Sequence, residues 1–177
     1  MRQVMTAEDI GRVATRIAHE IVERNHGLES VLILGIPTRG RPFADRIAAV
    51  LSEIAGSEVV AGSLDIGMYR DDLDTRPRTR IGPTDIPKPI DGADVVLADD
   101  VLYTGRTIRA ALDALADLGR PATVQLAVIV DRGHRQLPIR PDYVGKNIPT
   151  SASEHVSVRL TPHDDEDGVW IGNEVGV

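Results

Sequence analysis

Two neighbouring carboxylates, Asp99 and Asp100, separate a hydrophobic run from a short turn of hydroxyl residues and glycine. The whole segment consists of Val95, Val96, Leu97, Ala98, Asp99, Asp100, Val101, Leu102, Tyr103, Thr104, Gly105, Arg106 and Thr107. If a strand turns into a helix here, the first backbone N–H groups of that helix can bind a phosphate. The hydroxyls of Thr104 and Thr107 add donors, and Gly105 lets the main chain approach the anion closely.

The two carboxylates would repel a bound phosphate unless they bind a group that lies next to it. Vicinal hydroxyls of a sugar donate hydrogen bonds, and they are therefore a suitable partner for Asp99 and Asp100. The segment predicts a ribose 5-phosphate site, with the acids on the 2′ and 3′ hydroxyls and the turn on the 5′ phosphate. Taken as two isolated acids, without the turn that follows, Asp99 and Asp100 would rather indicate a solvated strand end or a helix N-cap pair.

Two further segments carry residues that suit anions. Residues 35–42, Gly-Ile-Pro-Thr-Arg-Gly-Arg-Pro, join a hydrophobic run to a helical pattern, as any ordinary strand–helix connection would. Residues 70–92 are charged, contain four prolines and show no sustained period. A loop of that length inside a compact domain is either functional or a surface excursion, and composition alone does not decide between the two.

Hydrophobic runs alternate with amphipathic helical patterns along the chain. Strands are predicted at 31–35, 58–66, 95–98 and 123–130, with shorter ones at 155–160 and 169–171. A helix is predicted from a cap at Thr6 to a stop at Gly27, and two others over 43–51 and 108–118. This alternation predicts an α/β fold with a mainly parallel sheet and helices on both faces. Ligands bind such sheets beyond the carboxyl ends of the strands, so the loops at 36–41, 99–107 and 131–147 are the candidate sites.

Composition excludes several classes of protein. A chain of 177 residues with 42% hydrophobic residues and a mean hydropathy of −0.10 is typical of one soluble globular domain. No apolar stretch approaches the roughly 20 residues that span a bilayer, and the start lacks a signal-peptide core, which predicts a cytoplasmic protein. The absence of cysteine excludes disulfides and cysteine-ligated metals. A net charge of −7 with 3% aromatic residues argues against non-specific polyanion binding, but not against a local basic patch.

The segment 95–107 resembles the 5-phosphoribosyl 1-pyrophosphate (PRPP) binding motif of the type I phosphoribosyltransferases. It is neither a Walker loop nor a dinucleotide fingerprint. In that superfamily the loop after the first core strand binds pyrophosphate through backbone amides and a basic residue, with an unusual peptide conformation. The positions that match this loop are Thr38, Arg39 and Gly40. A mobile basic lid closes over the reacting groups and would exclude water, and its matching residues are Tyr69, Arg70, Arg76, Arg78 and Arg80.

Longer stretches are similar to the PyrR family and together cover almost the whole chain. They are residues 15–25, 35–40, 64–73, 98–107, 118–121, 124–140 and 142–151. The resemblance implies a type I phosphoribosyltransferase fold in a single domain over 1–177. It implies a lid loop at about 70–92 and a small hood region from about 131–177 and parts of the N-terminus. It also implies a homodimer or a higher oligomer.

PyrR proteins couple uracil phosphoribosyltransferase activity to the regulation of pyrimidine operons. The implied reaction converts uracil and PRPP to UMP and pyrophosphate. Asp99 and Asp100 would bind the ribose and, mostly through water, a Mg²⁺ ion, while Arg39 and the lid arginines would neutralise the leaving group. The candidates for uracil binding, through backbone groups, are Val130, Asp131 and Arg132.

The family resemblance also implies binding to the leader of pyrimidine operon messenger RNA, modulated by the uridine nucleotides UMP and UTP. The matching residues are Thr15, Arg16, His19, His134, Arg135, Arg140 and Lys146. On the first helix these residues also fit a solvated helix exterior, because Glu20 and Glu23 stand among them. Two alternatives to a bifunctional protein therefore stay open, a salvage enzyme without RNA regulation and an RNA-binding regulator with vestigial catalysis.

Acidic residues near the C-terminus partly match a calcium-binding loop. Residues 163–174 place Asp165, Asp167 and Glu174 at EF-hand positions 3, 5 and 12, but His163 occupies the first position. We expect a turn between two short terminal strands rather than a calcium site.

Overall fold

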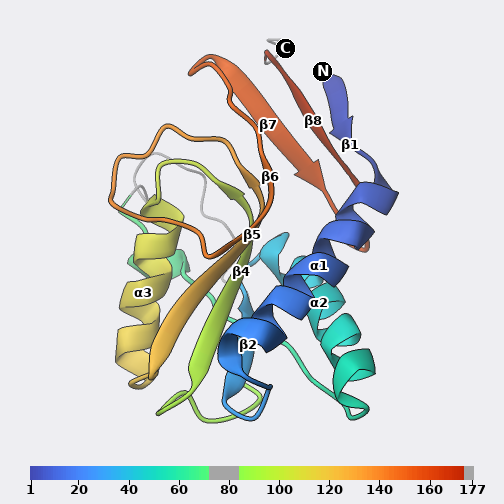
Figure 1. Cartoon of the computed structure of the whole chain (residues 1–177). Coiled ribbons are helices and arrows are strands. Elements are labelled where there is room, and N and C mark those ends of the chain that lie inside the picture. The colour runs from blue at the N-terminus through green and yellow to red at the C-terminus, as the bar shows by residue number, and fades with distance from the viewer. Residues whose placement is uncertain (72–83, 174–177) are drawn as a thin grey trace.

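A five-stranded parallel sheet forms the centre of the computed structural model, which describes residues 1–71 and 84–173 (Figure 1). Its strands are β2 (Val31–Gly35), β3 (Gly62–Ser63), β4 (Asp94–Leu102), β5 (Thr123–Asp131) and β6 (Tyr143–Asn147). They lie in the order β3-β2-β4-β5-β6. The central strands are buried on both faces, which explains why their sequences are continuous hydrophobic runs rather than alternating ones.

Helices cover both faces of this sheet, as the alternating pattern predicts. The helices α1 (Ala7–Asn25) and α2 (Gly40–Ala55) pack into one hydrophobic cluster, and α3 (Arg106–Leu118) packs into the other on the opposite face. A short 3₁₀ helix, η1 (Gly67–Tyr69), lies beside α3. The first helix begins with a capping box, because Thr6 Oγ1 accepts from the N–H of Asp9 while Asp9 accepts from the N–H of Thr6.

A second, antiparallel sheet of three strands is formed by both ends of the described chain. It consists of β1 (Arg2–Met5), β7 (Glu154–Arg159) and β8 (Gly168–Asn173), in the order β1-β8-β7. Figure 1 shows these strands standing beyond the end of α1 at which that helix begins. The turn predicted between the two terminal strands is confirmed, since residues 160–167 join β7 to β8.

Three predictions about strands were wrong. The strand expected at 58–66 is only two residues long, because β3 is an edge strand that pairs with β2 at Gly62 and Ser63 alone. The strand expected to end at Ala98 continues to Leu102, since its last residues pair with β5. The segment 143–147 was not expected to be a strand, yet it pairs with β5 as β6. In each case pairing with a neighbour determined the length, which local composition does not encode.

No helix among the described residues is both long enough and apolar enough to cross a membrane.

Candidate active site

A cleft of about 700 Å³ opens beyond the carboxyl end of β4. The end of β4, the first turn of α3, the residue before α2 and the strand β7 of the small sheet all contribute to its walls. Its lining residues are Arg39, Arg70, Asp99, Asp100, Val101, Leu102, Tyr103, Thr104, Gly105, Arg106, Thr107, Ile108, Arg132, His155, Val156, Ser157 and Val158. The predicted acids, the predicted phosphate turn and the predicted pyrophosphate arginine therefore share one cavity.

The two carboxylates of β4 occupy different environments. The Asp99 residue is 6% exposed, and its Oδ1 accepts a hydrogen bond of 2.9 Å from the N–H of Asp100. Burial, and then the charge of Asp100, raise the pKa of the Asp99 carboxyl well above its ordinary value. The Asp100 side chain is only partly buried, and its Oδ1 accepts 2.8 Å from the N–H of Val101. Asp99 is thus not a solvated strand end, and neither acid caps α3, whose N-cap is Gly105.

The turn 103–105 joins β4 to α3. Gly105 adopts a φ of 92°, a backbone conformation that favours glycine, and it lies directly before the first residue of α3. The turn is held from outside, because the carbonyl of Thr104 accepts from the N–H of Gln136 at 2.9 Å. The residues that open α3 line the cleft, so the end of the helix that attracts anions faces the cavity.

The loop between β2 and α2 approaches β4 closely. The N–H of Ile36 donates to the carbonyl of Ala98 at 2.9 Å, and a Cβ added at Gly40 would lie 2.3 Å from that same oxygen. The peptide bond between Pro37 and Thr38 is cis, so the unusual conformation that the resemblance implied is present. Arg39 is the residue of this loop that lines the cleft, whereas Thr38 and Gly40 are not among the lining residues.

The segment predicted as a lid is described only at its root. Tyr69 donates a hydrogen bond of 2.7 Å from its hydroxyl to Asp117 on α3, and the pKa of Tyr69 is raised by that contact. Arg70 lines the cleft and donates to Oγ1 of Thr107 at 3.3 Å. The other predicted lid residues, Arg76, Arg78 and Arg80, lie outside the described residues.

Of the three residues predicted for uracil, Arg132 is the one that lines the cleft. It is 6% exposed, donates to the carbonyl of Glu154 at 2.8 Å, and stacks its guanidinium 4.1 Å from the ring centre of Tyr103. Its Nε has no hydrogen-bond partner among the described residues. Val130 is buried within the sheet, where β5 pairs on both sides.

The third uracil candidate, Asp131, is bound within the protein. Its carboxylate accepts 2.6 Å from Arg135 and 3.0 Å from the N–H of Gly133. Although partial burial opposes the charged form, these donors hold the pKa of Asp131 below its ordinary value. The structure therefore brings Arg132, but neither Asp131 nor Val130, to the cavity.

The residues predicted for RNA fall into two groups. Thr15, Arg16 and Lys146 line a groove of about 1030 Å³ between α1 and β6, and exposed His19 lies one helical turn after Thr15. His134, Arg135 and Arg140 instead belong to the connection between β5 and β6.

In the connection between β5 and β6, the predicted side chains differ in the hydrogen bonds that they already make within the protein. Arg135 donates to the carbonyls of Ile139 and Tyr103 as well as to Asp131, so its guanidinium is committed within the protein. His134 lies 2.6 Å through Nε2 from the carbonyl of Thr150, and Arg140 is exposed. The residues predicted for RNA therefore lie in two separate groups, and the guanidinium of Arg135 is already bound by groups of the protein.

Sequence reasoning missed the contribution of the small sheet. Residues 155–158 of β7 form one wall of the cleft, and Asp164 from the β7–β8 connection binds Arg39. No local pattern points to either contact, because both join segments that are distant in the chain, by 125 residues for Arg39 and Asp164. Only the placement of the small sheet over the larger one reveals them.

Protein side chains provide few ligands for a metal here. Within the described ranges, no group of three or more histidine, cysteine or acidic residues is arranged to hold a metal ion. The paired oxygens of Asp99 and Asp100 suit an ion that keeps most of its ligands as water or substrate oxygens, which is the behaviour of Mg²⁺.

Residues 2–163 match the family model described as phosphoribosyl transferase domain. The chain is 58% identical over 171 residues to the "Bifunctional protein PyrR" of Chloroflexus aurantiacus, covering 96% of this chain and 94% of that protein. It is 59% identical over 172 residues to the protein of the same name from Streptomyces coelicolor, covering 97% and 89%.

Solved structures share the fold at low identity. The hypoxanthine phosphoribosyltransferase of Trypanosoma cruzi superposes with a TM-score of 0.72 at 20% identity, over 95% of this chain and 92% of that one. A hypoxanthine-guanine phosphoribosyltransferase of Bacillus anthracis gives 0.72 at 17% identity, over 96% of each chain. With this fold and these relatives, the chain belongs to the PyrR family of type I phosphoribosyltransferase proteins.

Proposed function

We propose that this chain is a uracil phosphoribosyltransferase that converts uracil and PRPP to UMP and pyrophosphate. The observation that carries the proposal is the convergence of Asp99, Asp100, the 103–107 turn and Arg39 on one cleft. A sugar phosphate with a pyrophosphate on its anomeric carbon presents the matching groups, which are two hydroxyls for the acids, a phosphate for the turn and a second anion for Arg39. Similarity to curated PyrR proteins at 58–59% identity supports the same proposal.

In the proposed reaction the bond from C1′ to pyrophosphate breaks, and the electron pair leaves with the pyrophosphate oxygen. Uracil N1 bonds to C1′ and releases its proton to water or to the departing pyrophosphate. Positive charge develops on the sugar between the two events, so no covalent intermediate with the protein is required. The chain acts by orienting the ribose through Asp99 and Asp100 and by holding the leaving anion near Arg39.

The surroundings of Asp99 influence the charge with which it would bind the ribose. Burial and then the charge of Asp100 raise the pKa of Asp99, so the cleft disfavours a second negative charge beside Asp100. Sugar hydroxyls and cations entering the cleft would favour the ionised form instead. Mg²⁺, which we place at Asp99 and Asp100 mostly through water, supplies charge neutralisation of the pyrophosphate when it is bound.

For the base, Arg132 is the proposed neighbour of uracil. It lines the cleft, its guanidinium is fixed by the carbonyls of Glu154 and Ser151, and it lies against Tyr103. The lid and the hood are proposed to exclude water from the bound PRPP, since hydrolysis is the competing reaction. Tyr69 and Arg70 are the described residues at the root of that lid.

Formation of UMP from labelled uracil and PRPP tests the enzymatic proposal. We expect labelled UMP to form only when Mg²⁺ and both substrates are present. Labelled hypoxanthine is the matched control, because the superposed structures include enzymes named for that base. Absence of UMP, or equal use of hypoxanthine, would contradict the assignment.

The second activity that we propose is regulation of pyrimidine genes through messenger RNA, dependent on uridine nucleotides. The groove lined by Thr15, Arg16 and Lys146 supports it, because three cations, Arg12 and Arg16 of α1 and Lys146 of β6, line it together with the acids Glu8 and Asp9. A homodimer, with further assembly as an alternative, would place two such grooves in one particle. Arg16 already donates to the carbonyls of Val144 and Gly145, so RNA would meet a positioned side chain.

Titration of the cognate pyrimidine leader RNA at several salt concentrations tests this second activity. We expect saturable binding that weakens linearly in log affinity against log salt, as phosphate contacts require. A salvage enzyme without regulation would form UMP and show no saturable binding. A regulator with vestigial catalysis would bind RNA and form no UMP, so the two assays separate all three alternatives.

A further inference from the structure

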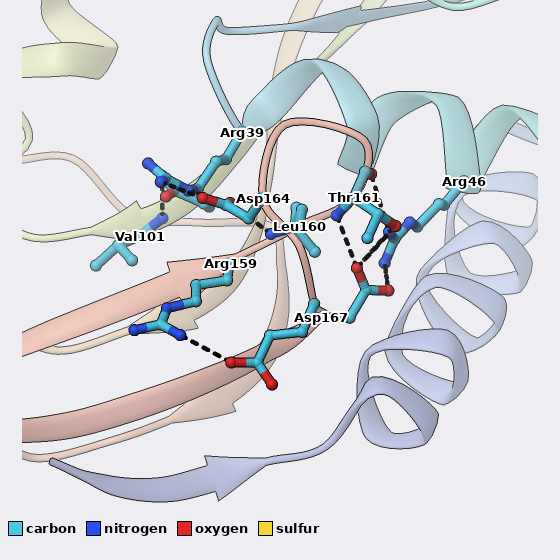
Figure 2. Close-up of polar contacts among 10 residues, drawn as sticks. Arg39, Arg46, Val101, Arg159, Leu160, Thr161, Asp164 and Asp167 are labelled. Carbon is cyan, nitrogen blue, oxygen red and sulfur yellow. Dashed lines mark hydrogen bonds and ion pairs between the residues drawn. The ribbon is translucent and has the colours of Figure 1, made fainter.

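The pyrophosphate arginine is held by a carboxylate from the small sheet. Asp164, in the connection between β7 and β8, lies 125 residues along the chain from Arg39. Its Oδ2 accepts 2.8 Å from Arg39 Nε and its Oδ1 accepts 2.8 Å from Nη2, a bidentate contact (Figure 2). The N–H of Leu160 donates to the same carboxylate at 2.7 Å, so the carboxylate is itself fixed.

The contact with Asp164 occupies the edge of the Arg39 guanidinium that carries Nε and Nη2, and it does not involve Nη1. A guanidinium carries five N–H donors in a rigid plane, so fixing Nε and Nη2 also fixes the direction of Nη1. Among the described residues Nη1 makes no hydrogen bond. Arg39 lines the cleft and feels the charge of Asp100, while its side chain is 32% exposed. The free edge is therefore the part of Arg39 that can meet an anion in the cavity.

A second ion pair, between Arg46 and Asp167, also joins α2 to the connection between β7 and β8. Arg46, seven residues after Arg39 and about two turns along the same helix, binds Asp167 with Nη1–Oδ2 of 2.7 Å and Nη2–Oδ1 of 2.9 Å. Figure 2 shows both arginines reaching the same connection. Arg46 is not among the residues that line the cleft. Asp167 therefore anchors the connection without touching the site, whereas Asp164 anchors it through a site residue.

We propose that Asp164 is a positioning residue, which orients the guanidinium of Arg39 so that its free edge faces the pyrophosphate of the substrate. The inference rests on the proposed function, since it takes Arg39 as the pyrophosphate ligand. It assigns the small sheet a role in substrate binding beyond forming a wall. The single connection between β7 and β8 couples that sheet to the loop before α2.

Binding of inorganic pyrophosphate to the full chain, measured by calorimetry with Mg²⁺ present, tests the proposal directly. In Asp164→Asn the bidentate contact is lost, and we expect pyrophosphate to bind about 10-fold more weakly, with a matching rise in KM for PRPP. The KM for uracil should stay within about twofold, because the proposed neighbour of the base, Arg132, is held by Ser151 and Glu154 and not by Asp164. In the matched control Asp167→Asn, which breaks the other ion pair of the same connection, pyrophosphate affinity should change by less than about twofold.

Equal weakening in both variants would overturn the proposal, because it would mean that Asp164 only attaches the connection. An unchanged or tighter affinity in Asp164→Asn would also overturn it, and a tighter affinity would identify Asp164 as a competitor for Arg39. Arg39→Lys approaches the same contact from the other side, since it keeps the charge and loses the fork. It should weaken pyrophosphate to a similar degree even if Asp164→Asn folds poorly.

A double-mutant cycle separates positioning from independent effects. If Asp164 acts through Arg39, Arg39→Ala combined with Asp164→Asn should bind pyrophosphate no more weakly than Arg39→Ala alone. Additive losses would contradict the proposal. Because calorimetry needs no turnover, a wild-type chain that binds pyrophosphate but forms no UMP would refute the proposed function and still decide the role of Asp164.

Discussion

Two strand–loop–helix units meet at the cleft, and they present their chemistry in opposite ways. The strands β2 and β4 pair in parallel register from Val31 and Asp94 to Gly35 and Ala98, so their loops emerge side by side. In the β4–α3 unit the functional groups are local side chains within nine residues. In the β2–α2 unit the backbone approaches β4 closely, and the side chain that lines the cleft, Arg39, is bound by Asp164 from the β7–β8 connection.

The glycines of the two loops express the same difference. Gly105 is required for its backbone conformation, with a φ of 92°. Gly40 is required for space, because a Cβ there would lie 2.3 Å from the carbonyl oxygen of Ala98. The first requirement is local to the turn, and the second exists only because two elements are packed together. Two similar strand–helix loops are thus specified at different levels, one by its local backbone conformation and the other by tertiary packing.

The largest expected effect comes from removing one acid of the β4–α3 unit. Asp100→Asn keeps the size of the side chain and should lower kcat for UMP formation by about 10²–10³, because the charge that stabilises the reacting sugar is lost. Circular dichroism and urea unfolding should show an intact fold. Near-normal kinetics would refute the assignment of Asp100 to the ribose.

Substituting alanine for Gly40 and for Gly105 compares the stability cost of a packing clash with the cost of an unfavourable backbone conformation. Gly40→Ala should lower the free energy of unfolding by about 3 kcal/mol, because the clash is with backbone that is held in the sheet. Gly105→Ala should cost about 1–2 kcal/mol, mostly from the backbone conformation, since its nearest contact is the Ile139 side chain at 3.0 Å. Urea unfolding of both variants measures the difference, and the reverse order would contradict the distinction.

The pH dependence of the free energy of unfolding tests whether burial raises the pKa of Asp99. Its folded pKa is raised, so its contribution to stability is complete below the ordinary value of 3.8 and is lost as pH rises through the raised pKa. Asp99→Asn removes that loss. We expect the variant to gain free energy of unfolding over wild type as pH rises from 4 towards neutrality, in urea titrations without Mg²⁺. If the difference in free energy of unfolding between the variant and wild type stayed constant across that range, the pKa of Asp99 would not be raised in the folded protein.

The smallest expected effect is at a single hydroxyl of the phosphate turn. Thr107→Val removes one donor while its backbone N–H stays, so PRPP affinity should fall by about 5-fold, equivalent to about 1 kcal/mol. Thr123→Val, at the opposite end of the sheet where Thr123 bonds Asp94, is the matched control and should leave the affinity unchanged. A loss above about 100-fold would mean that the hydroxyl, rather than the backbone, dominates phosphate binding.

Much of the fold could be predicted because its signals are local. The helix cap at Thr6, the buried runs of β2, β4 and β5, and the amphipathic pattern of α3 each depend on residues close together in the chain. The segment 95–107 belongs to the same category, since its strand, acids and turn are consecutive. The prediction of a cytoplasmic protein and the predicted lid, by contrast, are not tested by these features and stay predictions.

The sequence by itself determined the layered α/β arrangement and the phosphate turn, because periodicity and turn chemistry act over a few residues. Tertiary structure decided how far β4 extends, that Asp99 is buried, and that Arg39 meets Asp164. It also placed Arg16 beside Lys146 in the groove that Arg135 does not line. These outcomes depend on contacts between distant segments, whose geometry exists only after the sheets and helices have packed together.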